Sequence, residues 1–257
     1  MTLRALLICG VLAAAACKSG QPDPSTLAPI PADPTLTRAR TDSLWQVGLK
    51  DFRKGNYNSA SEIFQRVVLE FTPGDPRIPE AHFYLGESYF GGRSQLQAVR
   101  QFRKVADEFP SNPLAPEALY RAGEAYADLW RKPELDPTYG QSAIATFTEL
   151  LNRYPDSPAA AKGRVQLNDL SNKFAYKEWE NARYYLRNKA PDSAILYLKS
   201  LVANYPNSPS AELALVKLVT IYRELGYVED AAEMCGALHQ YHPDAKNLDE
   251  ICPASGG

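Results

Sequence analysis

The sequence predicts an all-α protein built as an array of about five antiparallel helix pairs. A unit of a small residue, a bulkier residue four positions later and a closing proline occurs five times. In the first two units a glycine, Gly48 or Gly86, stands twelve residues before the small residue. Because an α-helix has about 3.6 residues per turn, the small and bulky residues share one face, and the proline ends that helix. The glycine then marks a second helix, which precedes each unit.

The five units differ in detail. Four of them keep the proline eight positions after the bulky residue: Ala98, Phe102, Pro110; Ala143, Phe147, Pro155; Ala194, Leu198, Pro206; and Ala231, Cys235, Pro243. The first unit has Ala60, Phe64 and Pro73, so its proline comes one residue late. The third has its glycine at Gly123, with eight extra residues around 132–137 before the alanine.

This pattern resembles the tetratricopeptide repeat, which has a period of roughly 34 residues. The resemblance covers residues 38–243 and implies a superhelix whose concave surface holds an extended peptide or another domain. One helix pair is too small to bury its own apolar face, so neighbouring pairs must stack. We divide the array into an N-terminal half at 38–158, a C-terminal half at 159–243 and a tail at 244–257. Whether 159–189 is one helix or two stays open, because Asn168 to Asn172 weaken its middle.

The beginning of the chain predicts export and lipidation. Residues 1–16 carry Arg4 and then an apolar run of about twelve residues, which is too short to span a bilayer and is typical of a signal peptide. The segment from Ala14 to Cys17 resembles the bacterial lipobox, with Ala14 where Leu is usual. We predict cleavage before Cys17 and its lipidation; the alternative is an ordinary cleavage site with an incidental cysteine. Residues 17–37 then form the lipidated cysteine and a proline-rich tether, and Lys18 implies sorting to an outer membrane.

Charge and residue content argue against several functions. The chain has 28 basic and 30 acidic residues, so no global field recruits nucleic acid or anionic lipid. Only three histidines are present, and no phosphate loop or nucleophile arrangement is found. We therefore predict no catalytic activity and no cofactor. His239, His242 and Asp244 could share a metal, but histidines at a helix C-terminus favour the helix dipole without one, and we predict no metal site.

Two cysteines, Cys235 and Cys252, lie at the C-terminal end. In an oxidising envelope they could pair, closing a loop worth on the order of 3 kcal/mol in the chain-entropy picture. Cys235 also occupies the bulky core position of its repeat, where a buried free thiol would be equally suitable. Both alternatives stay open.

Aromatic residues recur three positions before and four positions after the repeat glycines. On stacked helices these positions fall beside the stacking face, on the concave side, and an aromatic trough suits an extended segment that presents aromatic side chains. The alternative is that Trp45 or Phe52 caps the exposed N-terminal end of the stack. The predicted groove residues are Trp45, Phe52, Phe83, Phe90 and Tyr120.

Several segments together resemble the BamD family, over essentially the whole mature chain. They are 136–147, 153–164, 176–185, Ala194, 205–226 and 231–232. BamD is the outer-membrane lipoprotein of the β-barrel assembly machinery, with five tetratricopeptide repeats. Each segment alone is repeat-like, and the long stretch at 159–189 is the most distinguishing part.

The resemblance implies a non-catalytic scaffold on the periplasmic face of the outer membrane, held there only by its lipid. Its C-terminal repeats, with Arg187, Lys199 and Arg223, would bind the POTRA domains of a BamA-type barrel protein. Its N-terminal aromatic groove would receive the aromatic-ended strand of unfolded barrel proteins, and other assembly lipoproteins are expected partners. The alternative is a lipoprotein with the same repeats that assists pilus secretin assembly or the cell-wall and division machinery.

Overall fold

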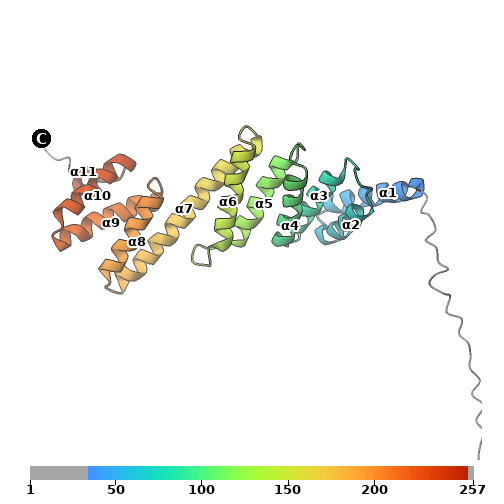
Figure 1. Ribbon diagram of the computed structural model, residues 1–257. Coiled ribbons are helices and arrows are strands. Elements are labelled where there is room, and N and C mark those ends of the chain that lie inside the picture. The colour runs from blue at the N-terminus through green and yellow to red at the C-terminus, as the bar shows by residue number, and fades with distance from the viewer. Residues whose placement is uncertain (1–33, 254–257) are drawn as a thin grey trace, which may run out of the picture.

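The computed structural model describes residues 34–253, and within that range it contains eleven α-helices and no strand. Figure 1 shows the helices following one another along an elongated array, with α1 at one end and α10 and α11 at the other. The first ten form five antiparallel pairs, which confirms the predicted repeat array. The helices are α1 (Pro34–Arg53), α2 (Tyr57–Glu70), α3 (Ile78–Gly91), α4 (Gln95–Glu108), α5 (Ala115–Leu129), α6 (Thr138–Arg153), α7 (Pro158–Arg187), α8 (Pro191–Asn204), α9 (Pro209–Leu225), α10 (Val228–Tyr241) and α11 (Leu248–Ile251).

Within each of the first three pairs, the bulky residue of the second helix packs against the glycine of the first. The phenylalanines are completely buried, as are the alanines one turn before them. An added Cβ on these glycines would stand only 2.5–2.9 Å from the ring, so no larger residue fits without displacement: Gly48 against Phe64, Gly86 against Phe102 and Gly123 against Phe147. The glycine and the phenylalanine of the sequence pattern are therefore the two sides of one close helix contact.

The helix ends follow from local sequence. Ser157 and Ser208 each stand before a proline at the start of a helix, and their hydroxyl oxygens accept hydrogen bonds from the backbone N–H three residues on. Gly226 ends α9 in the left-handed conformation with φ of 78°. Helix α1 begins at Pro34, four residues before the repeat region was expected at residue 38, because a proline is well suited to the first turn of a helix.

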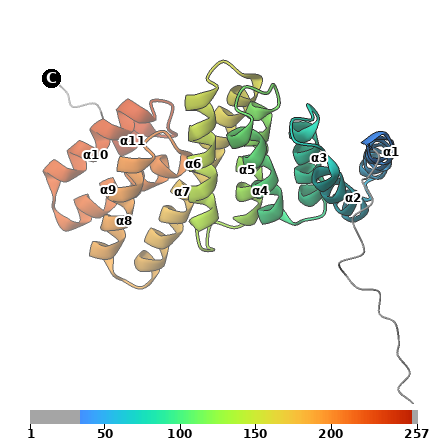
Figure 2. The same cartoon turned by 45° about the vertical axis from the view of Figure 1, so that its right-hand side comes forward.

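Helix α7 is continuous over 30 residues, from Pro158 to Arg187. Its asparagines do not interrupt it because tertiary packing fixes the middle, where Leu170 and Phe174 are buried. In Figure 2 it runs between α6 and α8, and it also packs against both α5 and α9. The open question of one helix or two is thus answered in favour of one.

The two halves of the array meet inside α7. Ala159, Leu170 and Phe174 belong to a buried cluster with α5 and α6, whereas Ala175 and Ala182 belong to a cluster with α8, α9 and α10. The buried cluster therefore changes between residues 174 and 175, inside the first helix of the fourth pair. The reason is that a helix of this length has room to contact two neighbouring pairs.

Helix α7 also holds the extra residues between α5 and α6. The Lys173 ammonium lies 4.6 Å from the Trp130 ring centroid and donates a hydrogen bond to the Trp130 carbonyl. One turn later, Lys177 Nζ donates to the carbonyl oxygens of Pro133, at 2.9 Å, and Leu135, at 3.2 Å. The insertion that interrupts the repeat spacing is therefore anchored to the long helix by two lysines.

Candidate binding surface

Two of the predicted groove residues, Phe52 and Phe83, line one hollow of about 290 Å³ between α1, α3 and the start of α5. Tyr84 also lines the hollow and packs edge-on against both rings, with centroid distances of 5.4 Å to Phe52 and 6.5 Å to Phe83. Phe52 and Phe83 are half-buried, so part of each ring stays accessible. The remaining lining residues are Glu80, Glu87 and Leu114.

Next to this hollow, Arg121 forms an ion cluster that covers Phe90. Its guanidinium makes two contacts to Glu87, at 2.5 and 2.8 Å, and one to Glu124 at 2.5 Å. The same group lies 4.2 Å from the Phe90 ring centroid. Burial alone would lower the pKa of Arg121, but the two glutamates outweigh it and raise that pKa overall. Phe90 therefore presents a face that is already occupied by a cation.

Trp45 and Tyr120 are core residues, which corrects their placement in an open groove. Trp45 is 6% exposed and packs against Phe64 and Phe71 inside the first two pairs. Tyr120 is 7% exposed, lies 5.7 Å from the Phe147 ring and donates its hydroxyl to Glu124 at 2.8 Å. Burial and Glu124 raise the Tyr120 pKa to about 12. Neither ring is accessible to a ligand. Each is covered by its own helix pair and by the next repeat, from which Tyr84 lies 5.8 Å from the Trp45 ring and Lys162 Nζ lies 5.0 Å from the Tyr120 ring.

The sequence reasoning missed Glu80, Tyr84 and Glu87. A search that started from Phe83 and moved by three or four residues along the helix would have found the two glutamates, since these positions share a face. Tyr84 carries no such signal, because neighbouring residues on a helix ordinarily point in different directions, and its contact with Phe52 depends on how α1 packs beside α3.

A larger hollow of about 590 Å³ lies at the turn between α2 and α3. Its central cation, Arg77, is bound by Asp75 at 2.9 Å and Asp42 at 2.6 Å, and its guanidinium lies 4.6 Å from the Phe71 ring centroid. The hydrogen bonds from Arg77 lower the Asp75 pKa. These three groups satisfy one another and tie the turn to α1.

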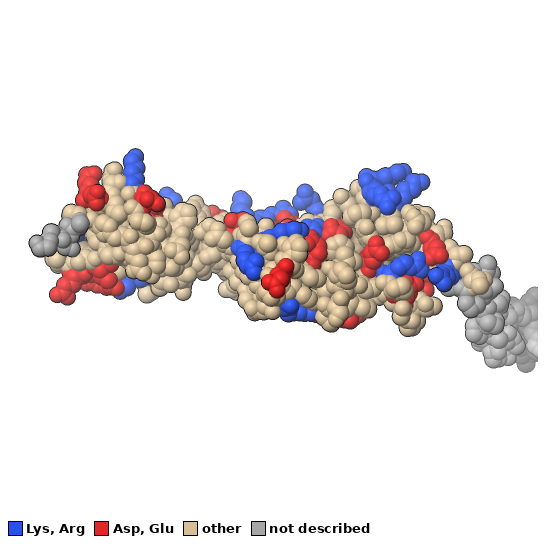
Figure 3. Space-filling model, turned by 90° about the horizontal axis from the view of Figure 1, so that it is seen from above, with Lys and Arg blue, Asp and Glu red and all other residues tan. Residues whose placement is uncertain are grey.

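The three predicted partner residues lie on three successive helices and are all exposed: Arg187 ends α7, Lys199 lies on α8 and Arg223 lies near the end of α9. Among residues 34–253 no hydrogen bond or ion pair joins them to one another. Figure 3 shows basic and acidic side chains mixed along one face of the array, with one basic group over the N-terminal repeats. The three predicted partner residues are therefore single charges that are not connected to one another.

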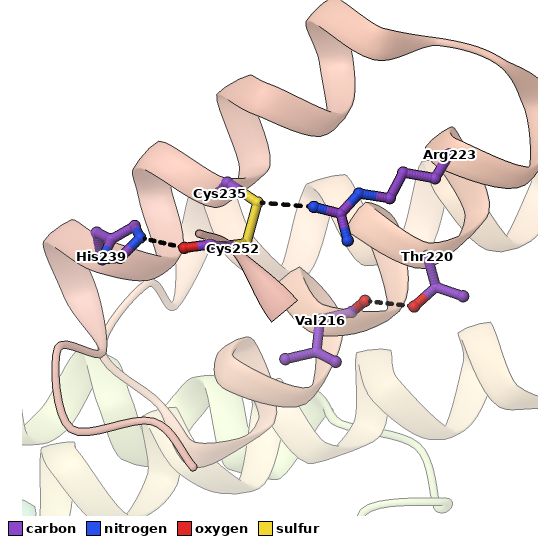
Figure 4. Close-up of a disulfide and its surroundings, with 6 residues drawn as sticks. All are labelled: Val216, Thr220, Arg223, Cys235, His239 and Cys252. Atoms are coloured by element: carbon purple, nitrogen blue, oxygen red, sulfur yellow. Dashed lines mark hydrogen bonds between the residues drawn. A yellow bond between two sulfur atoms is a disulfide. The ribbon is translucent and has the colours of Figure 1, made fainter. Parts of the chain in front are cut away.

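Cys235 and Cys252 are joined by a disulfide with a Cα–Cα distance of 5.4 Å (Figure 4). Cys252 is buried, while Cys235 is half-buried. The Arg223 guanidinium lies 3.9 Å from the Cys235 sulfur, and His239 Nε2 is 2.9 Å from the Cys252 carbonyl oxygen. The bridge fixes the segment after α10 against the last repeat.

The two C-terminal histidines point to separate backbone acceptors. His239 bonds the Cys252 carbonyl, and His242 Nε2 lies 2.8 Å from the carbonyl oxygen of Pro206. Within residues 34–253 no group of three or more His, Cys, Asp or Glu side chains could hold a metal ion. His82 is buried beside Gln101, at 2.8 Å, and burial lowers its pKa. Cys17 lies outside the described residues.

Comparison with known proteins gives consistent results. The family model YfiO, described as an outer membrane lipoprotein, matches residues 38–237. The outer membrane protein assembly factor BamD of Rickettsia prowazekii is 25% identical over 95% of this chain and 92% of its own length. The BamD protein of Caulobacter vibrioides is 24% identical over 73% of this chain, which spans 61% of that relative's length. The BamD protein of Vibrio cholerae is 34% identical over 42% of this chain and 44% of its own.

The similarity to solved structures is low in both sequence identity and TM-score. A thermophilic TPR protein of Thermus thermophilus covers 82% of this chain, and this chain covers 95% of it, with 17% identity and a TM-score of 0.37. In the described part of the chain no helix is both long and apolar enough to cross a bilayer. The match of the family model over most of the sequence decides the identity: the chain belongs to the YfiO family of outer membrane lipoproteins, and it is a BamD-family outer membrane assembly protein.

Proposed function

We propose that this protein is a non-catalytic scaffold of the outer-membrane machinery that assembles β-barrel proteins. The observation that carries the proposal is the family match over residues 38–237, together with relatives that are named outer membrane protein assembly factors. The repeat array supports it, because stacked helix pairs provide extended surfaces for binding other proteins. The pilus and cell-wall alternatives have no comparable support.

In this proposal the N-terminal repeats receive a segment of an unfolded barrel protein at the hollow between Phe52 and Phe83. The half-buried rings supply apolar and aromatic contact area with few rotatable bonds to fix. Trp45 supports the hollow from within the core through its contact with Tyr84, and Phe90 contributes only through its contact with Arg121. Tyr120 has no direct part in the hollow.

The C-terminal repeats bind the POTRA domains of a BamA-type partner, with Arg187, Lys199 and Arg223 as candidate contacts. Their exposure on consecutive helices supports this assignment. Lipidation of Cys17 would hold the protein at the periplasmic face of the outer membrane, so that the membrane is contacted through the lipid alone. Other assembly lipoproteins remain expected partners.

The test is photo-crosslinking of the full-length, detergent-extracted protein to a barrel-derived peptide, combined with affinity purification of the BamA-type partner. Phe52→Ala with Phe83→Ala is expected to abolish peptide crosslinking and to leave partner recovery intact. Phe109→Ala is the matched control, because it truncates another half-buried phenylalanine that does not line the hollow. Unchanged crosslinking in a folded double variant would refute the groove, and absence of any barrel-assembly partner would refute the function.

A further inference from the structure

The charged side chains that line the hollow at Phe52 and Phe83 are all acidic. Two glutamates, Glu80 and Glu87, line it, and no lysine or arginine does. Glu87 is neutralised by the two contacts from Arg121. Glu80, in the first turn of α3, makes no hydrogen bond and no ion pair within the part of the chain that the structure describes. One half-buried, unpaired carboxylate therefore faces whatever occupies the hollow.

The size of the hollow limits what enters it. Its volume of about 290 Å³ is just below the ~300–1,000 Å³ that small-molecule sites occupy. It is open to a single large apolar side chain from an extended segment, with the backbone of that segment passing outside. A charge carried by the residue next to that side chain then comes close to Glu80.

We propose that the hollow selects an apolar or aromatic side chain with a lysine or arginine directly beside it in sequence, and that Glu80 is the residue that makes this selection. This inference rests on the proposed function. Opposite charges across a binding surface favour the right ligand, and like charges placed together reject the wrong one. A free C-terminal carboxylate next to the inserted ring would meet Glu80 and be repelled. The end of the bound chain therefore lies away from the hollow, which differs from the insertion of a terminal aromatic residue that the family resemblance implies.

The experiment is fluorescence anisotropy with the full-length protein in neutral detergent and four short labelled peptides. Three are amidated and carry one internal phenylalanine beside Lys, Gln or Glu, and the fourth ends in phenylalanine with a free carboxylate. We expect the order Lys, Gln, Glu from tightest to weakest, with about two- to fivefold between successive peptides, as exposed ion pairs give. Amidation of the fourth peptide should strengthen its binding. Raised salt should reduce the differences in affinity among the four peptides, because it screens the charges.

Glu80→Gln should reduce the Lys-to-Glu difference to less than about twofold. Glu62→Gln is the control, because Glu62 is an exposed carboxylate on α2 that does not line the hollow, and it should leave the order unchanged. Equal binding of the three amidated peptides, or an order that survives Glu80→Gln, overturns the inference. If the three peptides bind equally and Phe83→Ala abolishes that binding, the proposed peptide-binding function stands and only the charge selection by Glu80 fails. If no peptide binds at all, the proposed peptide-binding function and the charge selection both fail.

Discussion

Gly123 lies directly against the ring of Phe147: a Cβ on this glycine would stand 2.5 Å from the ring carbon Cε1. We expect Gly123→Ala to lower the free energy of unfolding, since overpacking costs about 1–3 kcal/mol and exceeds the gain of about 1 kcal/mol in helix propensity. Urea denaturation followed by circular dichroism measures this change.

The matched control is Gly236→Ala on α10, where an added Cβ meets nothing within 4 Å. This variant should be more stable than the wild type, by at most about 1 kcal/mol, because alanine favours the helix. Equal effects of the two substitutions would show that the Gly123 contact is not tight.

Removal of the disulfide should loosen the end of the array. We expect Cys235→Ser with Cys252→Ser to lose about 2–4 kcal/mol, as the loss of a cross-link in a short loop does. Ala245, Leu248 and Ile251 pack against the last buried cluster, so limited proteolysis should then remove the tail sooner. Wild-type protein in reductant should melt like the double variant, and the double variant should not respond to reductant. If reductant leaves the melting of the wild-type protein unchanged, the disulfide is contradicted.

Glu149 should contribute stability that depends on pH. Its carboxylate accepts hydrogen bonds from Arg103 at 2.5 Å and Arg153 at 2.7 Å, which ties α4 to α6. Burial alone would raise the Glu149 pKa, but the two arginines outweigh it and lower that pKa below its usual 4.5. A lowered carboxyl pKa stabilises the fold above 4.5, and this contribution is lost as the pH falls through the folded-state pKa.

The measurement is the free energy of unfolding of wild type and Glu149→Gln from pH 7 down to acid. The variant should be less stable at pH 7 by about 1 kcal/mol or less, given its partial exposure. The two curves should converge as the pH falls below 4.5. Glu62→Gln, on the exposed face of α2, should follow the wild type throughout. A gap that stays constant with pH would exclude Glu149 as the source.

Charge reversal tests the proposed partner surface. Arg187→Glu should reduce recovery of the BamA-type protein by about two- to fivefold at low salt, since a rim charge is worth only a fraction of a kcal/mol to about one. Arg66→Glu makes the same change on an exposed position of α2, in the other half of the array, and should have no effect. Equal losses from both variants would point to a general charge effect instead of a surface.

The repeat array was predictable because the contact between Gly48 and Phe64 recurs in the next two pairs, with eight extra residues in the third, and needs only one helix pair. Which aromatic side chains are accessible in the groove was not predictable in the same way. Trp45, Phe83 and Tyr120 share the same offset from their glycines, yet only Phe83 is accessible, because the neighbouring repeat decides what is covered. The continuity of α7 also depends on distant contacts, such as Lys177 with the turn at Pro133, which local propensity does not contain.

Helix α7 is continuous over 30 residues and contributes to both buried clusters, so it connects the two halves of the array that carry the proposed binding surfaces. A partner that tilts the last two repeats must carry α7 with it, and α7 in turn carries the loop that Lys173 and Lys177 hold. We therefore expect that a partner bound at the C-terminal repeats would change the orientation of the N-terminal repeats through α7.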